Sequence, residues 1–143
     1  MAALTFLRDS DKQAYTFLSS LHAADYLPAT PRFAVHYELL CRARVERLHV
    51  KALLPDPAAG DDSFNGNGAL PEIESCVELF PSADFQEREA YDFFGIVFRG
   101  HPDMRRILMP DDYVGWPQRR DFPVGGEPVL FTHNEIELPR WYE

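Results

Sequence analysis

The clearest hydrophobic pattern is an alternation of apolar and polar residues in two runs between residues 32 and 54. A period of two residues is typical of strands that bury only one face. The pattern therefore predicts an antiparallel hairpin of residues 32–40 and 48–54, with its apolar face covered by a helix. The apolar positions are Phe33, Val35, Tyr37 and Leu39 in the first run, and Leu48, Val50, Ala52 and Leu54 in the second.

Two other stretches have the spacing of a helix. After Ser10 the chain is apolar at positions 14, 17, 18 and 21, and Ser10 with Gln13 has the pattern of a capping box. This predicts a short amphipathic helix that ends near His22. A second helix is predicted from Asp84, which would form a capping box with Glu87, to Gly95, because glycine commonly ends helices in a left-handed conformation.

The second predicted helix is apolar on two sides, and both sides also carry carboxylates. A helix of this kind is usually covered on both sides, here by its own domain and by a partner. A carboxylate on a covered face is unfavourable unless it is paired. We therefore expect Glu89 and Asp92 to pair with cations of the next segment, which are Arg99, His101, Arg105, Arg106, Arg119 and Arg120.

The remaining patterns are shorter. Residues 96–98 and 107–109 predict two edge strands, residues 73–80 a short helix or turn, and residues 55–69 a mobile surface insertion. Residues 110–143 are rich in proline and lack periodicity, which predicts an extended segment along a neighbour. The predicted fold class is α+β. A small mixed or antiparallel sheet packed by short helices fills residues 1–109, and an extended irregular C-terminal tail contacting neighbouring subunits follows at 110–143.

Composition narrows the class of protein. A chain of 143 residues corresponds to one domain, and 45% hydrophobic with 26% charged residues is ordinary for a soluble globular protein. The net charge of −9 argues against nucleic acid or an anionic membrane as the main partner. No apolar run is long enough to span a membrane, and residues 1–7 are too short for a signal peptide, so a cytoplasmic location is expected.

One interpretation of Glu87, Glu89, Asp92 and His101 is an acid–base or metal site. None of them has HxxxH, ExxH or HxH spacing, and a carboxylate among arginines stays charged and is a poor general acid. The other histidines are scattered, and no nucleophile or nucleotide-binding motif is present. Cys41 and Cys76 lack metal-binding spacing and are expected to be buried thiols. We expect no catalytic, metal or cofactor-binding residue on this chain.

The tail is also aromatic. Its rings are suited to stacking on a quinone or a base, but anchors of a protein–protein interface are the favoured interpretation. A binding module therefore fits the sequence better than an enzyme, and an independent soluble regulator stays open as a third class. The aromatic residues are Tyr113, Trp116, Phe122, Trp141 and Tyr142.

Residues 84–121, which we call the signature segment, carry a family resemblance. Glu87-Arg88-Glu89 is followed after two residues by Asp92-Phe93-Phe94, and then at fixed spacing by His101, Arg105 and Ile107-Leu108. This order, with GIVFRGHPDMRRILMPDDY and RRDFP, resembles the 30-kDa subunit family of respiratory complex I, the NADH:quinone oxidoreductase, which includes its bacterial members. The resemblance covers residues 70–124 and, more weakly, 5–54.

The resemblance implies a non-catalytic α+β subunit of the hydrophilic arm, packed on the 49-kDa-type subunit near the quinone-reducing end. It implies a peripheral place at the cytoplasmic face of the inner membrane, without nucleic acid. Iron–sulfur clusters, FMN and quinone would belong to neighbouring subunits. The residues implied at the interface or in its structure are Glu87, Arg88, Glu89, Asp92, Phe93, Gly95, His101, Pro102, Arg105, Arg106, Arg119, Arg120 and Asp121.

Two points stay open at this stage. Membrane-bound hydrogenases, F420H2 dehydrogenase and the photosynthetic NDH-1 complex contain similar subunits, so the chain also fits an equivalent subunit of one of these. The tract that usually reads Gly-His-Pro-Leu-Arg-Lys-Asp-Phe in the family has tryptophan at position 116 and glutamine at position 118 here. The local contacts of these two residues are expected to differ from those of the family pattern.

Overall fold

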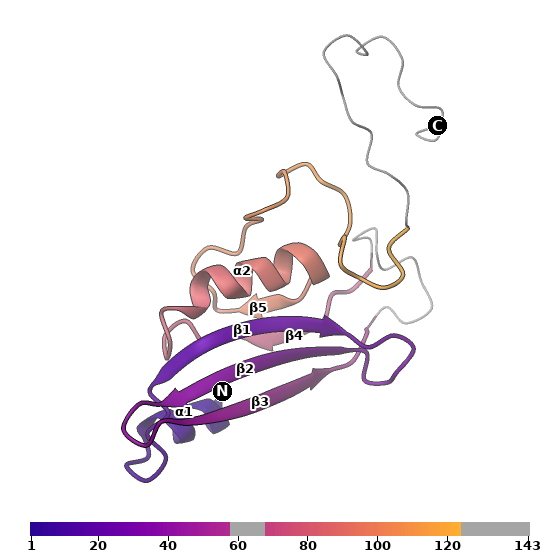
Figure 1. Cartoon of the computed structure of the whole chain (residues 1–143). Coiled ribbons are helices and arrows are strands. Elements are labelled where there is room, and N and C mark those ends of the chain that lie inside the picture. The colour runs from indigo at the N-terminus through magenta and orange to yellow at the C-terminus, as the bar shows by residue number, and fades with distance from the viewer. Residues whose placement is uncertain (58–67, 124–143) are drawn as a thin grey trace, which may run out of the picture.

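The computed structural model describes residues 1–57 and 68–123, so the predicted insertion and the end of the predicted tail lie largely outside the described residues. The order of elements gives an α+β fold, as predicted from the sequence (Figure 1). The elements are helix α1 (Ala2–Asp9), strands β1 (Phe17–Asp25), β2 (Phe33–Cys41), β3 (Glu46–Leu54) and β4 (Glu72–Glu74), helix α2 (Ala83–Phe94) and strand β5 (Val97–Arg99).

The predicted hairpin is confirmed as β2 and β3, which pair antiparallel. Tyr37 lies opposite Val50 and Leu39 opposite Leu48, so the alternating apolar side chains share one face. Strand β1 pairs antiparallel with the other edge of β2, which gives a three-stranded sheet in the order β1-β2-β3. Strand β2 is therefore the central strand, and its inward side chains are among the most buried in the described chain.

The first predicted helix is wrong, because residues 17–22 belong to β1 and the residues before them form a turn. Ser10 is the C-cap of α1 rather than the N-cap of a new helix. The register of β1 shifts between Leu18 and Ser20, and this bulge lets Leu18 and Leu21 both turn their side chains into the core. Two apolar residues three positions apart imitate helical periodicity, although the backbone is extended.

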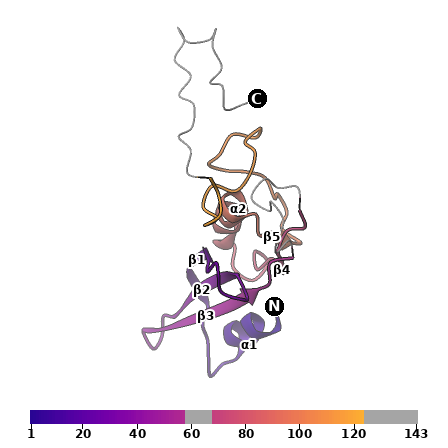
Figure 2. The ribbon, with the colours of Figure 1, turned by 90° about the vertical axis from the view of Figure 1, so that its right-hand side faces the viewer.

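The two faces of the sheet have different surroundings. Helices α1 and α2 and the β4–β5 pair lie on one side of it, and no described segment lies on the other (Figure 2). Helix α2 packs mainly on β1, and Leu4 of α1 is buried in the same core cluster as the inward side chains of the strands. The apolar side of the sheet is thus covered by two helices, and neither is the helix predicted from residues 10–22.

The short strands β4 and β5 pair in parallel, which places residues before α2 beside residues after it. This confirms a strand close to the predicted residues 96–98. Residues 107–109 do not form the second predicted edge strand, for a reason given below. Cys41 and Cys76 are free and fully buried, as expected of small apolar side chains.

Candidate functional site

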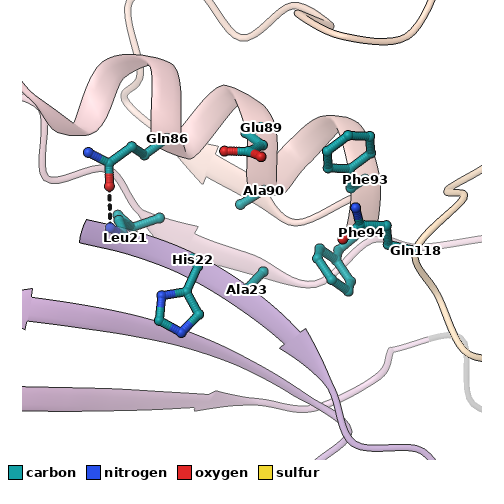
Figure 3. A pocket seen from close by; sticks show the side chains of 9 residues that line it. All are labelled: Leu21, His22, Ala23, Gln86, Glu89, Ala90, Phe93, Phe94 and Gln118. Atoms are coloured by element: carbon teal, nitrogen blue, oxygen red, sulfur yellow. Dashed lines mark hydrogen bonds between the residues drawn. The ribbon is translucent and has the colours of Figure 1, made fainter.

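Helix α2 is held on β1 by polar contacts at its N-terminal end and by small side chains along its length. The Ser82 hydroxyl donates to the carbonyl of Leu18, and the amide of Leu21 donates to Oε1 of Gln86 (Figure 3). Ala83 and Ala90 are buried against the core, so the helix lies close to the sheet. These contacts fix the position of the side chains that α2 presents on its other faces.

The capping box predicted for α2 is wrong, although the helix is confirmed. Its N-cap is Ser82 without a side-chain cap, and Glu87 is engaged elsewhere. The Glu87 carboxylate is fully buried and accepts 2.7 Å hydrogen bonds from the Ser75 hydroxyl and the Cys76 amide. Glu87 therefore ties α2 to the turn after β4. Burial and the neighbouring Glu87 raise the pKa of the Cys76 thiol far above its usual range, which keeps the thiol protonated and unreactive.

Asp92 is the centre of the signature segment. It is fully buried, and its Oδ1 accepts a 2.7 Å hydrogen bond from Nη1 of Arg106. Its Oδ2 accepts hydrogen bonds from the amides of Ile107 (3.1 Å), Leu108 (2.7 Å) and Met109 (2.9 Å). Three successive amides cannot converge on one oxygen in a strand, where neighbouring amides point to opposite sides. This is why residues 107–109 are not the predicted strand.

The pairing expected for Asp92 is confirmed, and its partner is the second of two adjacent arginines. Arg106 pairs with it, whereas Arg105 lies 71% exposed and pairs with Asp103 at 2.7 Å. Burial by itself would raise the pKa of Asp92, but the hydrogen bonds from the Met109 amide and from Arg106 outweigh it and hold the pKa below its usual range. Asp92 is therefore a permanent anion.

Arg88 and His101 fasten the same segment to the N-terminal half of α2. Arg88 donates to the carbonyls of Arg105 (3.3 Å) and Arg106 (3.2 Å). The His101 side chain is fully buried, and its Nδ1 accepts from the Asp103 amide at 3.0 Å. Its Nε2 lies 3.3 Å from Oδ1 of Asp84. The residues that follow the helix thus run back along it.

Gly95 ends α2 as predicted, with a φ of +70° and a hydrogen bond from its amide to the Tyr91 carbonyl. Its second role was not evident from the sequence. A Cβ on Gly95 would lie only 2.5–2.8 Å from the indole ring of Trp116. The indole therefore occupies the space that a side chain would fill, and the Arg106 guanidinium lies 4.7 Å above the same ring.

The last three signature residues attach the segment to one end of the sheet. The Arg119 Nε donates to the Phe94 carbonyl at 2.7 Å, and its side chain is buried. Burial, together with the nearby Arg32, lowers the pKa of Arg119 to about 10. The Arg120 amide donates to Asp25, and Asp121 accepts a 2.6 Å hydrogen bond from Arg32.

Arg32 is the hub of this attachment, and sequence reasoning missed it. Its guanidinium pairs with Asp25 and Asp56 at 2.8 Å and with Asp121 at 2.6 Å. Burial opposes its charge, but the three carboxylates outweigh burial and raise the pKa of Arg32 further above its ordinary value. These residues are far apart in sequence, and only their positions beside strand ends could have suggested a cluster.

The beginning of the predicted tail packs on its own chain. Trp116 and Arg119 are buried against α2 and the sheet, and Tyr113 lies 6.4 Å from Phe122 between ring centroids. Residues 110–123 therefore make more contacts within the chain than the sequence suggested. The expected contacts of the rest of the tail with a neighbour lie outside the described residues.

Three predicted site residues, Glu89, Phe93 and Pro102, form no side-chain hydrogen bond within the described residues, although the Phe93 carbonyl accepts a hydrogen bond from the Gln118 amide at 3.2 Å. Glu89 is exposed, and among the described residues it forms no ion pair, contrary to the expected pairing with an arginine. Phe93 and Glu89 line a small hollow between β1 and α2 together with His22 and Gln118 (Figure 3). Pro102 is exposed in the turn after His101.

The signature segment combines buried carboxylates that are held by hydrogen bonds with apolar side chains that are exposed. The carboxylates of Glu87 and Asp92 are buried and accept hydrogen bonds on both oxygens, and in residues 1–57 and 68–123 no group of three histidine, cysteine or acidic side chains is arranged to hold a metal ion. No helix among those residues is long and apolar enough to cross a membrane. Three apolar side chains of the segment remain open to solvent, Phe85 (63% exposed), Leu108 (60%) and Val114 (71%).

Comparison with known proteins gives a consistent result. The family described as respiratory-chain NADH dehydrogenase, 30 Kd subunit, matches residues 1–128. A protein of Herpetosiphon aurantiacus, named as the C subunit of an NADH-quinone oxidoreductase, is 45% identical over 130 residues, which cover 91% of this chain and 69% of that protein.

Proteins with the same name come from two further organisms. The one from Roseiflexus castenholzii is 45% identical over 133 residues, covering 93% of this chain and 70% of that protein. The one from Saccharopolyspora erythraea is 42% identical over 134 residues, covering 93% of this chain and 49% of that protein. The match spans both the sheet and the signature segment, and the chain belongs to the family of 30 kDa subunits of the respiratory-chain NADH dehydrogenase.

Proposed function

We propose that this chain is a non-catalytic subunit of the hydrophilic arm of a proton-translocating NADH:quinone oxidoreductase. In this assembly it docks on the 49-kDa-type subunit near the quinone-reducing end, at the cytoplasmic face of the membrane. The family membership supports the assignment, and the relatives described above carry the name of that oxidoreductase. Their shared name favours it over the related hydrogenase, F420H2 dehydrogenase and photosynthetic complexes.

One observation carries the docking proposal. The signature segment satisfies its charges internally, through Asp92 and Arg106, while it leaves Phe85, Leu108 and Val114 more than half exposed. Internal ion pairs fix the shape of a surface, and exposed apolar side chains on a fixed surface are typical of a protein interface. The segment therefore has the properties of a preformed docking surface for a neighbouring subunit.

The test is the affinity of the chain for the 49-kDa-type subunit. We expect the double variant Phe85→Ser, Leu108→Ser to bind at least about tenfold more weakly, because it removes apolar contact area from the interface. Phe6→Ser is the matched control, since Phe6 is 61% exposed but lies on α1. Circular dichroism must show that all variants are folded. Binding of the double variant at wild-type affinity would contradict docking through this segment.

The absence of a redox centre on this chain is part of the proposal. Flavin, iron–sulfur clusters and quinone would be held by neighbouring subunits, in keeping with the burial of Cys41 and Cys76. The purified chain should therefore show no flavin or iron–sulfur absorbance and should not oxidise NADH. Deletion of its gene should abolish quinone-linked NADH oxidation by the complex. Stoichiometric iron or flavin on the isolated chain would contradict this part.

A further inference from the structure

The open face of the sheet carries a row of three histidines, one from each strand, whose rings are nearly parallel. The rings of His22 and His36 lie 4.8 Å apart and parallel, and those of His36 and His49 lie 4.9 Å apart. His36 is buried in the middle, where its Nε2 lies 3.0 Å from the Tyr26 hydroxyl and its Nδ1 lies 2.7 Å from Nε2 of His49. We call these three residues the histidine ladder.

The ladder is not arranged as a metal site. The lone pair and the N–H bond of an imidazole nitrogen lie in the plane of its ring, so nearly parallel rings do not aim their nitrogens at one point. The hydrogen bond between Nδ1 of His36 and Nε2 of His49 also leaves one proton between these two atoms. In the described part of the chain, no set of three possible ligands is arranged to hold a metal ion. The ladder therefore needs another interpretation.

The charge of the open face is opposite to that of the whole chain. The side chains of Arg47 and Lys51 lie on this face, on the β3 edge, and Arg42 reaches over it to stack 4.5 Å above Phe17. Among the described residues of the three strands and their turns, Glu38 is the one acid that lies on this face. A basic surface on a chain of net charge −9 is complementary to an acidic partner.

The face also has apolar surface that no described segment covers. Leu53 is 52% exposed on the β3 edge, beside Lys51 and His49, both of which are exposed as well. A single exposed leucine is ordinary on a protein surface, so the charge of this face, rather than its apolar area, favours a docking partner.

We propose that the open face of the sheet docks an acidic segment of a neighbouring protein subunit, and that docking draws protons onto the histidine ladder. The proposal rests on the proposed function, because the neighbour is another subunit of the same complex. It concerns a different surface from the exposed residues of the signature segment. The carboxylates of the docked segment would lie over Lys51, Arg47 and the ladder.

The contacts of His36 explain why docking would favour protonation of the ladder. Facing it are His22 from β1, Glu38 from its own strand, His49 and Lys51 from β3, and the hydroxyl of Tyr26. Burial, followed by the positive neighbours, lowers the pKa of His36 in the free chain. Carboxylates placed over the ladder would favour the charged imidazole, so docking would take up protons and would tighten as the pH falls.

The distribution of lysines makes a direct test simple. The chain has two lysines, Lys51 on the open face and Lys12 in the exposed turn after α1. Acetic anhydride labelling of the isolated chain and of the purified complex, read by mass spectrometry, compares them within one sample. We expect Lys51 to be labelled at least about tenfold more slowly in the complex, and to be more strongly protected than Lys12. A carbodiimide should also join Lys51 to an aspartate or glutamate of another subunit.

Each outcome has a defined meaning. Labelling of Lys51 in the complex at the rate of the isolated chain, without a carbodiimide cross-link, overturns the docking proposal and leaves the proposed function intact. Failure of the chain to co-purify with the oxidoreductase overturns both. Incorporation of the variant Lys51→Glu, Arg47→Glu gives a second measurement, with Lys12→Glu as control. We expect the double variant to be incorporated less well than the unchanged chain, and a lower pH to restore part of its incorporation. Lys12→Glu should show neither effect.

Discussion

The charged side chains on the two faces of the three-stranded sheet differ in whether they have partners within the chain. On the covered side, each buried carboxylate of α2 has its partners within the chain, Glu87 with Ser75 and Cys76, and Asp92 with Arg106 and three amides. On the open side, cations outnumber acids, and most of the polar side chains reach solvent. The charges of the covered side stabilise the fold, whereas those of the open side are available to a partner.

A charged residue in a sequence can have one of two roles, in folding or in binding. A charge with internal partners stabilises the fold and is expected to respond strongly to substitution. An exposed charge contributes little to stability even when it is paired, because exposed ion pairs are weak, but it remains available for binding. Spacing along the chain does not distinguish the two, as the neighbours Arg105 and Arg106 show.

The largest effect should come from breaking the ion pair at Asp92. Arg106→Ala leaves a buried carboxylate with part of its compensation removed, and we expect the free energy of unfolding to fall by about 3 kcal/mol. Arg105→Ala is the matched control and should change it by less than about 0.5 kcal/mol, because its partner Asp103 is exposed on the surface. Urea unfolding of the isolated chain measures both. Equal effects would show that Asp92 does not depend on Arg106.

A somewhat smaller effect should come from filling the space at Gly95. Gly95→Ala places a methyl group in the indole of Trp116 and also strains a positive φ, and together these should cost about 2–4 kcal/mol. Gly100→Ala shares the positive φ of +83° but has no atom within 4 Å of its new Cβ. It should cost about 1 kcal/mol, from strain alone. Thermal unfolding of both variants isolates the contribution of the indole contact.

The charges of the open face should matter little to the isolated chain. Lys51→Gln removes the cation 3.9 Å from the Tyr26 ring, and we expect a change in stability of about 0.5 kcal/mol or less. The same substitution should weaken incorporation into the complex. A loss of several kcal/mol in the isolated chain would mean that the open face, too, uses its charges for folding.

The smallest predicted effect is a dependence of stability on pH. Because the pKa of His36 is lowered by folding, the unfolded chain binds more protons, and stability should decline as the pH falls below about 6.5. The pKa of Asp92 is also lowered, but its contribution is present above about pH 3.9 and is lost only in stronger acid. Urea midpoints between pH 7.5 and 5.5 should thus report the loss at His36 and not the loss at Asp92. His36→Gln should flatten this slope, and an unchanged slope would contradict the assignment.

Local patterns predicted local structure well. The alternation of residues 32–54 predicted β2 and β3 with nearly correct ends, and Gly95 marked the end of α2. The same reasoning failed at β1, because a bulge gave Leu18 and Leu21 the spacing of a helix. Periodicity reports which residues share a face, and a bulged strand and a helix can place the same residues on one face.

Contacts between residues that are distant in sequence could not be predicted from the sequence alone. The need of Asp92 for a cation followed from its position on a covered face, but the choice of Arg106 depends on a turn that aims three amides at one oxygen. Strand register decides which residues meet in the cluster around Arg32, and it places the three histidines of the ladder side by side. Each arises from tertiary placement, which periodicity along a single chain does not encode.

The cluster around Arg32 also has a mechanical consequence. It joins the end of β1, the start of β2, the residues after β3 and Asp121, at one end of the sheet. A load applied to the chain at Pro123 would reach this cluster before it reached the contacts of Asp92 and Trp116. The cluster would spread that load over three strand ends. The exposed apolar surface of the signature segment would therefore keep its shape under tension.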